Sequence, residues 1–120
     1  MTGNDEAPIV ACVLDYFDGW FDGDADRMER ALHPKLAKRA LEDDGWTLNE
    51  TTAEWMIDAT ERGIGRQGDP GDRAIEVQVD DVHGPIANVT VRSAVYREYV
   101  QLARTADGWR IVNTLWTWTQ

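Results

Sequence analysis

Residues 16–34 of the chain, YFDGWFDGDADRMERALHP, decide the predicted fold. They join the end of a long amphipathic helix to a short second helix through Gly23. Glycine is common just past a helix end because it adopts the left-handed backbone there, and Asp24 is a favourable N-cap for the helix that follows. Pro34 then stops the second helix or bends the chain out of it.

The segment before this junction predicts a helix over residues 6–22. Its apolar side chains recur at helical spacing, and three aspartates lie on the other side. The apolar residues are Ile9, Val13, Tyr16, Phe17 and Trp20, and the aspartates are Asp15, Asp18 and Asp22. The second helix is expected to bury Met28, Ala31 and Leu32.

The middle of the chain predicts one further helical turn over residues 35–41 and a turn at residues 43–45. A third helix begins at Thr51 or Thr52 and points Trp55, Met56, Ala59 and Ile64 inward. Residues 63–72 predict a loop and a candidate lid. Their glycine spacing resembles a dinucleotide fingerprint, but that motif needs a strand before it and a helix after it.

The rest of the chain predicts about four antiparallel strands. Residues 75–80 alternate apolar and polar side chains, and residues 83–85 form a turn. Residues 86–97 predict a long strand with Val89, Val91 and Val95 on one face and Asn88, Thr90, Arg92 and Tyr96 on the other. Residues 98–105 and 109–119 predict a hairpin around the Asp107-Gly108 turn.

The last predicted strand is apolar on both faces, with Ile111 and Leu115 opposite Val112, Trp116 and Trp118. Such a strand must be covered on both sides. The helices supply one cover. The simplest second cover is another subunit, so we expect a homodimer.

The length and the net charge of the chain limit the classes of function that it could have. The 120 residues predict a single domain, residues 1–120, and a net charge of −10 argues against nucleic acid and anionic lipid surfaces as partners. The short apolar run at residues 7–14 fits neither a signal peptide nor a membrane span, so we expect a cytoplasmic protein. Cys12 is expected to be a buried structural thiol. His33 and His83 show no metal-binding spacing, and no metal or cofactor is expected.

Three helices followed by an antiparallel meander resemble the nuclear-transport-factor-2-like superfamily, which includes ketosteroid isomerases and SnoaL-type polyketide cyclases. Within it, the chain resembles the putative lumazine-binding group. The residues that carry this resemblance are Tyr16, Gly19-Trp20, Gly23-Asp24, Met28, Ala31-Leu32-His33-Pro34, Trp55, Asp107-Gly108-Trp109 and Ile111-Val112-Asn113. The resemblance implies an α+β cone, with a curved sheet around the helices, a pocket at the open end and a homodimer.

Tyr16 precedes Asp24 by eight residues, the spacing at which the isomerases carry their oxyanion-hole tyrosine. The resemblance therefore makes Tyr16 a candidate hydrogen-bond donor. The isomerase base would fall near residues 39–41, where this chain has no carboxylate. Glu42, Asp43 or Asp44 would need a shift in register, and His33 is an alternative base. On the sheet, Asn88, Thr90 and Arg92 are the candidate inward polar residues.

The leading hypothesis is a protein that binds a small apolar or aromatic molecule. Its candidate ligand-binding residues are Tyr16, Trp20, His33, Trp55, Asn88, Arg92 and Trp116. An isomerase or cyclase that uses Tyr16 as a donor is the second hypothesis, and a non-catalytic dimerisation module with a vestigial cavity is the third. A binding protein predicts a cavity of about 300 Å³ or more at the cone mouth.

Overall fold

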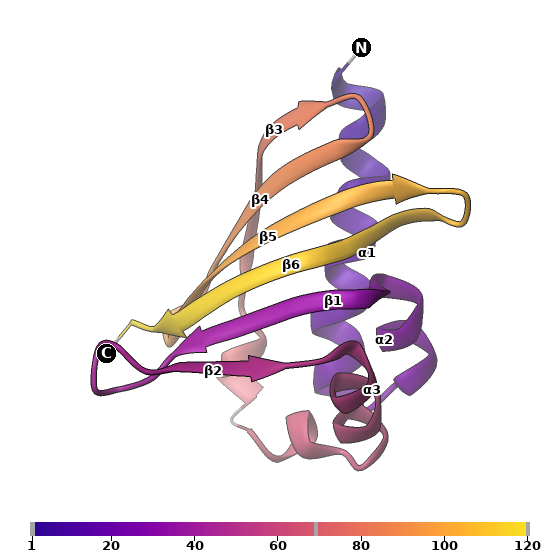
Figure 1. Cartoon of the computed structure of the whole chain (residues 1–120). Helices are drawn as coiled ribbons and strands as arrows, with labels where there is room; N and C mark the ends of the chain where they lie inside the picture. Colours follow the sequence, from indigo (N-terminus) through magenta and orange to yellow (C-terminus); the bar gives the residue numbers. More distant parts are fainter. Residues whose placement is uncertain (1, 69, 120) are drawn as a thin grey trace.

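The computed structural model describes residues 2–68 and 70–119, which form a curved six-stranded sheet around a long helix (Figure 1). The helices are α1 (Thr2–Asp22), α2 (Ala25–Ala31) and α3 (Ala53–Glu61), followed by the short 3-10 helices η1 (Ile64–Gln67) and η2 (Pro70–Arg73). The strands are β1 (Leu32–Leu41), β2 (Leu48–Thr51), β3 (Glu76–His83), β4 (Ile86–Arg92), β5 (Tyr96–Thr105) and β6 (Gly108–Trp118). The α+β class is as predicted, with six strands in place of four.

The sheet order is β2-β1-β6-β5-β4-β3, in which β1 pairs parallel to β6 and the other neighbours pair antiparallel. The inner face of this sheet packs on α1. Ile9 and Val13 of α1 and Val91 and Ile111 of the sheet are all 0% exposed. Full burial of one such side chain contributes about 1.5–3 kcal/mol. This core fixes α1 against the sheet and leaves the C-terminal end of the helix to line the open end of the cone.

The junction between α1 and α2 forms as the sequence predicts. Gly23 has a φ of 70°, and the Asp24 carboxylate accepts a hydrogen bond from the Arg27 backbone N–H at 3.2 Å. Asp15 of α1 also accepts hydrogen bonds from the side chains of Arg27 and Arg30 on α2. Burial pushes the pKa of Asp15 upward, but the hydrogen bonds from Arg30 and Arg27 outweigh it, and the pKa of this carboxyl is lowered.

Cys12 is buried, as the sequence predicts, and its thiol donates a weak hydrogen bond to the Ala31 carbonyl at 3.4 Å. Burial raises the pKa of this thiol to about 12. The thiolate is the reactive form of cysteine, so Cys12 is an inert packing residue.

The prediction of a helical turn over residues 35–41 is wrong, because this segment belongs to β1. Leu36 and Lys38 are buried and Arg39 is exposed, which is the period-two pattern of a strand. Pro34 disfavours helical backbone at the residue before it, so the chain leaves α2 extended. The segment then pairs with β6, from Ala37 opposite Asn113 to Ala40 opposite Trp116.

The third helix and the loop after it differ in part from the prediction. The Thr52 hydroxyl caps α3 by accepting from the Trp55 N–H at 3.1 Å, and Met56 and Ala59 are buried. Trp55 is not buried like Met56, since its side chain is 48% exposed. Residues 63–72 are not a plain loop, since they contain η1 and part of η2, and Ile64 lies in η1 rather than on α3.

The long strand predicted over residues 86–97 is interrupted. β4 ends at Arg92, and the Ser93 side chain accepts hydrogen bonds from the N–H groups of Val95 and Tyr96, which turns the chain. Tyr96 then begins β5 on the inner face, where its ring stacks on Phe17 with a centroid distance of 6.1 Å. The turn places Val95 at the open end of the cone.

The last strand contains a bulge that the sequence does not reveal. Gln101 pairs with Asn113 while Leu102 pairs with Ile111, so Val112 is an extra residue in β6. A bulge reverses which face each following side chain occupies. Ile111 is therefore buried inside while Leu115 is 48% exposed on the outer face, which corrects the prediction that these two residues share a side.

Candidate ligand-binding cavity

A cavity of about 400 Å³ lies at the open end of the cone. The end of α1, β1, β2, α3, η1 and the ends of β5 and β6 enclose it. Its walls are mainly aromatic. The aromatic lining residues are Tyr16, Phe17, Trp20, Phe21, Trp55, Tyr96, Trp116 and Trp118. The volume exceeds the value of about 300 Å³ that a small-molecule site typically needs.

A cluster of three polar side chains forms the floor of this cavity. The Tyr16 hydroxyl donates to Glu98 Oε2 at 2.9 Å, and the Lys38 ammonium donates to the same oxygen at 3.0 Å. Lys38 also donates to the Tyr16 hydroxyl oxygen. The side chains of Lys38 and Glu98 are only 9% and 4% exposed. The helix α1 and the strands β1 and β5, which are distant in sequence, thus meet at one cluster. In it the positive charge of Lys38 balances the negative charge of Glu98.

The electrostatics of the floor keep Tyr16 protonated. Burial raises the pKa of Tyr16 well above its ordinary value, and the negative charge and hydrogen bond of Glu98 raise it further. The single hydroxyl proton of Tyr16 is used in the hydrogen bond to Glu98. Lys38 also lies 5.5 Å from the centre of the Trp116 ring, at cation–π distance.

Two groups of this floor remain able to contact a ligand. An ammonium carries three N–H donors, and Lys38 uses two of them on Tyr16 and Glu98. Glu98 accepts both of its hydrogen bonds at Oε2, and within residues 2–68 and 70–119 its Oε1 accepts none. A donor and an acceptor therefore remain side by side below aromatic walls.

Trp55 and Trp118 form the mouth of the cavity, since they are 48% and 50% exposed although both line it. Below Trp118, Trp116 packs edge-on against it with ring centres 4.9 Å apart, and Trp116 in turn packs edge-on against Tyr96. The rings form a continuous apolar wall from the solvent to the floor.

The η1 segment closes one side of the cavity through Gly65. This glycine is buried, and a Cβ built there would lie 2.3 Å from the Trp20 carbonyl oxygen. Only a residue without a side chain fits so close to α1. Gly65 thus allows η1 to pack directly on Trp20. Part of the candidate lid, residues 63–72, therefore packs against α1.

The structure brings four of the seven candidate ligand-binding residues to this cavity, namely Tyr16, Trp20, Trp55 and Trp116. It places His33, Asn88 and Arg92 elsewhere. His33 Nδ1 accepts from the Lys35 N–H at 3.0 Å, where the chain enters β1. The other two lie on the outer face of the sheet, because Val89 and Val91 take the inner positions of β4.

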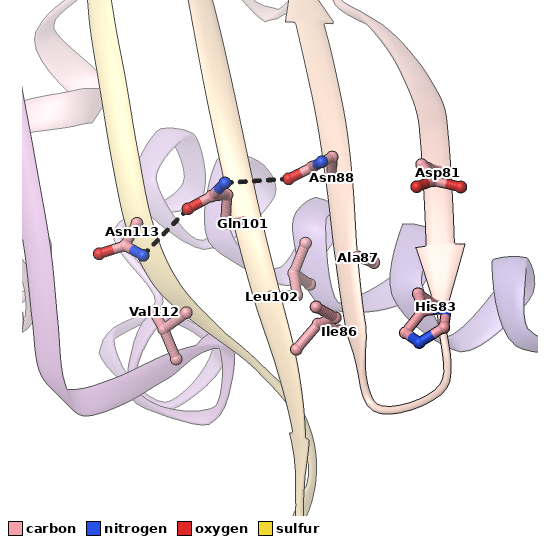
Figure 2. Close-up of a pocket in the computed structure, with 9 residues that line it drawn as sticks. All are labelled: Asp81, His83, Ile86, Ala87, Asn88, Gln101, Leu102, Val112 and Asn113. Carbon is pink, nitrogen blue, oxygen red and sulfur yellow. Dashed lines mark hydrogen bonds between the residues drawn. The ribbon is translucent and has the colours of Figure 1, made fainter.

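Asn88 belongs to a row of amides on that outer face (Figure 2). Arg92 donates to Gln78 Oε1 at 2.6 Å and pairs with Glu76. Thr90, the third inward candidate, donates to Asp80 Oδ2 at 2.5 Å. The strand register therefore turns the polar residues of β4 away from the cavity.

Sequence reasoning missed Lys38 and Glu98. The period-two alternation of residues 36–40, and of residues 96–102, was the available signal, because it places Lys38 and Glu98 among inward side chains. The alternative bases Glu42, Asp43 and Asp44 lie at the exposed start of the β1–β2 connection, and they do not line the cavity. Asp44 instead caps the Trp46 and Thr47 N–H groups.

In the part of the chain that the structure covers, no cluster of three or more His, Cys, Asp or Glu side chains is placed to hold a metal ion. Over the same part, no helix has the length and apolar character needed to cross a membrane.

The fold and this cavity are those of a small cone-shaped α+β protein. The family model described as putative lumazine-binding matches residues 4–117. The chain therefore belongs to the putative lumazine-binding family. No curated protein sequence matches the chain.

Solved structures share this fold at low sequence identity. An NTF2-like protein of unknown function from Silicibacter pomeroyi is 20% identical with a TM-score of 0.79, and the match covers 98% of each chain. One from Shewanella baltica is 13% identical with a TM-score of 0.74, covering 100% of this chain and 98% of that one. A protein described as a putative dehydratase of the NTF2-like family from Streptomyces avermitilis is 13% identical with a TM-score of 0.64, covering 100% and 99%. At these identities the similarity shows the fold alone.

Proposed function

We propose that this protein binds a small, neutral, planar aromatic molecule that carries a hydrogen-bond acceptor and donor on one edge. The observation that supports this proposal is the polar floor at the end of an aromatic cavity. Lys38 and Glu98 balance each other in charge at a distance of 3.0 Å, so a charged ligand would disturb the pair. A neutral ligand would accept from Lys38 and donate to Glu98 Oε1.

The aromatic walls favour a flat ring for the rest of the ligand. Trp20 lines the cavity from α1 and Trp116 lines it from β6, and each indole offers a large flat surface for stacking. Heteroaromatic lactams, in which an N–H stands beside a carbonyl, combine a flat ring with such an edge. The family's name mentions lumazine, which makes pteridine-type compounds reasonable members of a screen.

The direction of the Tyr16 hydrogen bond favours binding over the isomerase hypothesis. An oxyanion-hole donor must aim its proton at the substrate oxygen. Tyr16 donates its single proton to Glu98 instead, so Lys38 is the donor that remains for a ligand. We therefore assign these residues to binding and assign none to catalysis.

A thermal-shift screen of neutral planar heteroaromatic compounds tests this proposal. A compound present at 100 times its Kd is expected to stabilise the native state by about 2.7 kcal/mol and so to raise Tm. Trp55→Ala, at the cavity mouth, is expected to weaken Kd by about tenfold through lost stacking, which corresponds to about 1.4 kcal/mol.

Trp46→Ala is the matched control, because Trp46 is 80% exposed and does not line the cavity. It should leave the Kd unchanged. The proposal fails if no neutral compound shifts Tm, or if Trp55→Ala and Trp46→Ala bind the compound equally well.

We also propose that two copies associate through the outer face of the sheet. Ile86, Tyr99 and Leu115 are 56%, 51% and 48% exposed there, and Tyr99 and Leu115 lie opposite each other on β5 and β6. The only carboxylate of β4, β5 and β6 is Glu98, which points inward. The centre of this face therefore lacks the negative charge that would keep two chains of net charge −10 apart.

Light scattering on the purified protein is expected to give twice the chain mass of 13.6 kDa. A particle with the mass of one chain at micromolar concentration would contradict the homodimer and leave the ligand proposal untouched.

A further inference from the structure

A hollow of about 190 Å³ lies on the outer face of the sheet, apart from the ligand cavity (Figure 2). Ile86 and Val112 supply apolar side chains to its walls. It lies beside the β6 bulge, where Val112 is the extra residue and the strand departs from regular pairing. The hollow is smaller than the range of about 300–1,000 Å³ that separate small-molecule sites occupy, so its size suits one protein side chain better.

A row of three amides borders this hollow (Figure 2). Gln101 Nε2 donates to Asn88 Oδ1 at 3.0 Å, and Asn113 Nδ2 donates to Gln101 Oε1 at 3.1 Å. The chain of hydrogen bonds leaves donors on Asn88 and an acceptor on Asn113. An occupant with an apolar ring and one hydroxyl, which is the chemistry of a phenol, would match both the walls and this border.

Tyr99 is such a phenol on the same face of the same sheet, and its side chain is half exposed. It lies on β5 two residues before Gln101, while the hollow lies on the other side of Gln101, towards Leu102 and Val112. In a two-fold symmetric dimer, each contact occurs twice with the roles of the copies exchanged. A two-fold axis that runs across the strands near Gln101 would place each Tyr99 over the other copy's hollow.

The charges on this face agree with the same axis. Arg97 lies on β5 beyond Tyr99, and in residues 2–68 and 70–119 it has no ion-pair partner, while its buried Nε has no hydrogen-bond partner. Asp107 lies in the exposed β5–β6 turn at the opposite end of the strand. The axis that places Tyr99 over the partner's hollow also brings Arg97 towards the β5–β6 turn of the other copy, which carries the partner's Asp107.

From these two features we infer that the homodimer is held by Tyr99 of each copy inserted into the hollow of the other. This inference rests on the homodimer proposed above and adds its docking geometry. Tyr99 is the anchor, the amides contact its hydroxyl, and Arg97 pairs with the partner's Asp107.

Sedimentation velocity over a range of protein concentrations tests the anchor. Tyr99→Ala is expected to raise the dimer Kd by tenfold or more, since buried tyrosines at the centre of an interface carry much of its binding energy. Tyr99→Phe keeps the ring and should have a smaller effect. Trp46→Ala removes an even more exposed aromatic side chain that lies outside the hollow, and it should change nothing.

A charge exchange tests the orientation independently. Arg97→Asp and Asp107→Arg should each weaken the dimer, and the double variant should restore it. A dimer that persists unchanged in Tyr99→Ala, or no restoration in the double variant, would overturn the inference while the homodimer stands. A wild-type monomer would overturn both.

Discussion

Replacing Glu98 with alanine is expected to lower the free energy of unfolding by about 3–5 kcal/mol, because removal of one member of a buried ion pair leaves the other charge uncompensated. Here that charge is the Lys38 ammonium, whose side chain is 9% exposed. The same change removes the acceptor of the Tyr16 hydroxyl. Urea unfolding of the two proteins under identical conditions measures the difference.

The matched control is Glu76→Ala. Glu76 pairs with Arg92 at 3.4 Å on the surface, where its side chain is 71% exposed. Exposed pairs contribute about 0–1 kcal/mol, so this variant should unfold almost like the wild type. A loss below about 1 kcal/mol for Glu98→Ala would show that Lys38 finds water or another partner, and that its charge does not depend on Glu98.

The pair itself need not stabilise the fold. Replacement of a whole buried ion pair by apolar residues of similar size is often neutral or stabilising by about 1–4 kcal/mol. The triple variant Lys38→Met, Glu98→Leu and Tyr16→Phe, which leaves no buried hydroxyl without a partner, is therefore expected to unfold close to the wild type while losing the ligand contacts. Retained stability with lost binding would support a functional reason for placing Lys38 and Glu98 in the cavity.

Local sequence signals were enough for the helical part of the fold. Gly23 and Asp24 act through their own backbone and the next turn, so the end of α1 and the start of α2 follow from the residues themselves. The same holds for the Thr52 cap of α3 and for the Asp107-Gly108 turn. Tyr16 and Trp20 could be placed near the cavity because helical periodicity fixes their common face.

The rest depends on partners that are distant in sequence. Residues 35–41 contain good helix formers, yet they become β1 because β6, more than 70 residues later, offers a parallel edge to pair with. Lys38 and Glu98 are 60 residues apart and look like surface charges when each is considered alone. Their cluster exists only because β1 and β5 both face the end of α1.

Strand faces were the least predictable feature, because one extra residue reverses them. The Val112 bulge sends Leu115 to the outer face and keeps Trp116 inside. The turn at Ser93 similarly resets the alternation before Tyr96 and Glu98. Asn88 and Arg92, candidate inward residues, lie on the outer face because β4 points its valines inward.

Gly65→Ala is expected to lower the free energy of unfolding by about 3 kcal/mol, at the upper end of the usual cost of overpacking. The added Cβ would lie 2.3 Å from the Trp20 carbonyl oxygen, and this backbone atom of α1 cannot rotate away as a flexible side chain could. The η1 segment must therefore move away from Trp20. Thermal and urea unfolding measure the cost.

The Gly45→Ala variant separates this steric effect from a general effect of losing a glycine. Gly45 has a φ of 88°, and a Cβ there meets no atom within 4 Å, so its cost comes from the backbone conformation alone. Both variants lose a glycine, but only Gly65→Ala should displace η1 and weaken binding of a compound found in the screen. If Gly65→Ala binds that compound with the wild-type Kd, η1 does not form part of the ligand site, and the cavity must be closed by α3 and β2 instead.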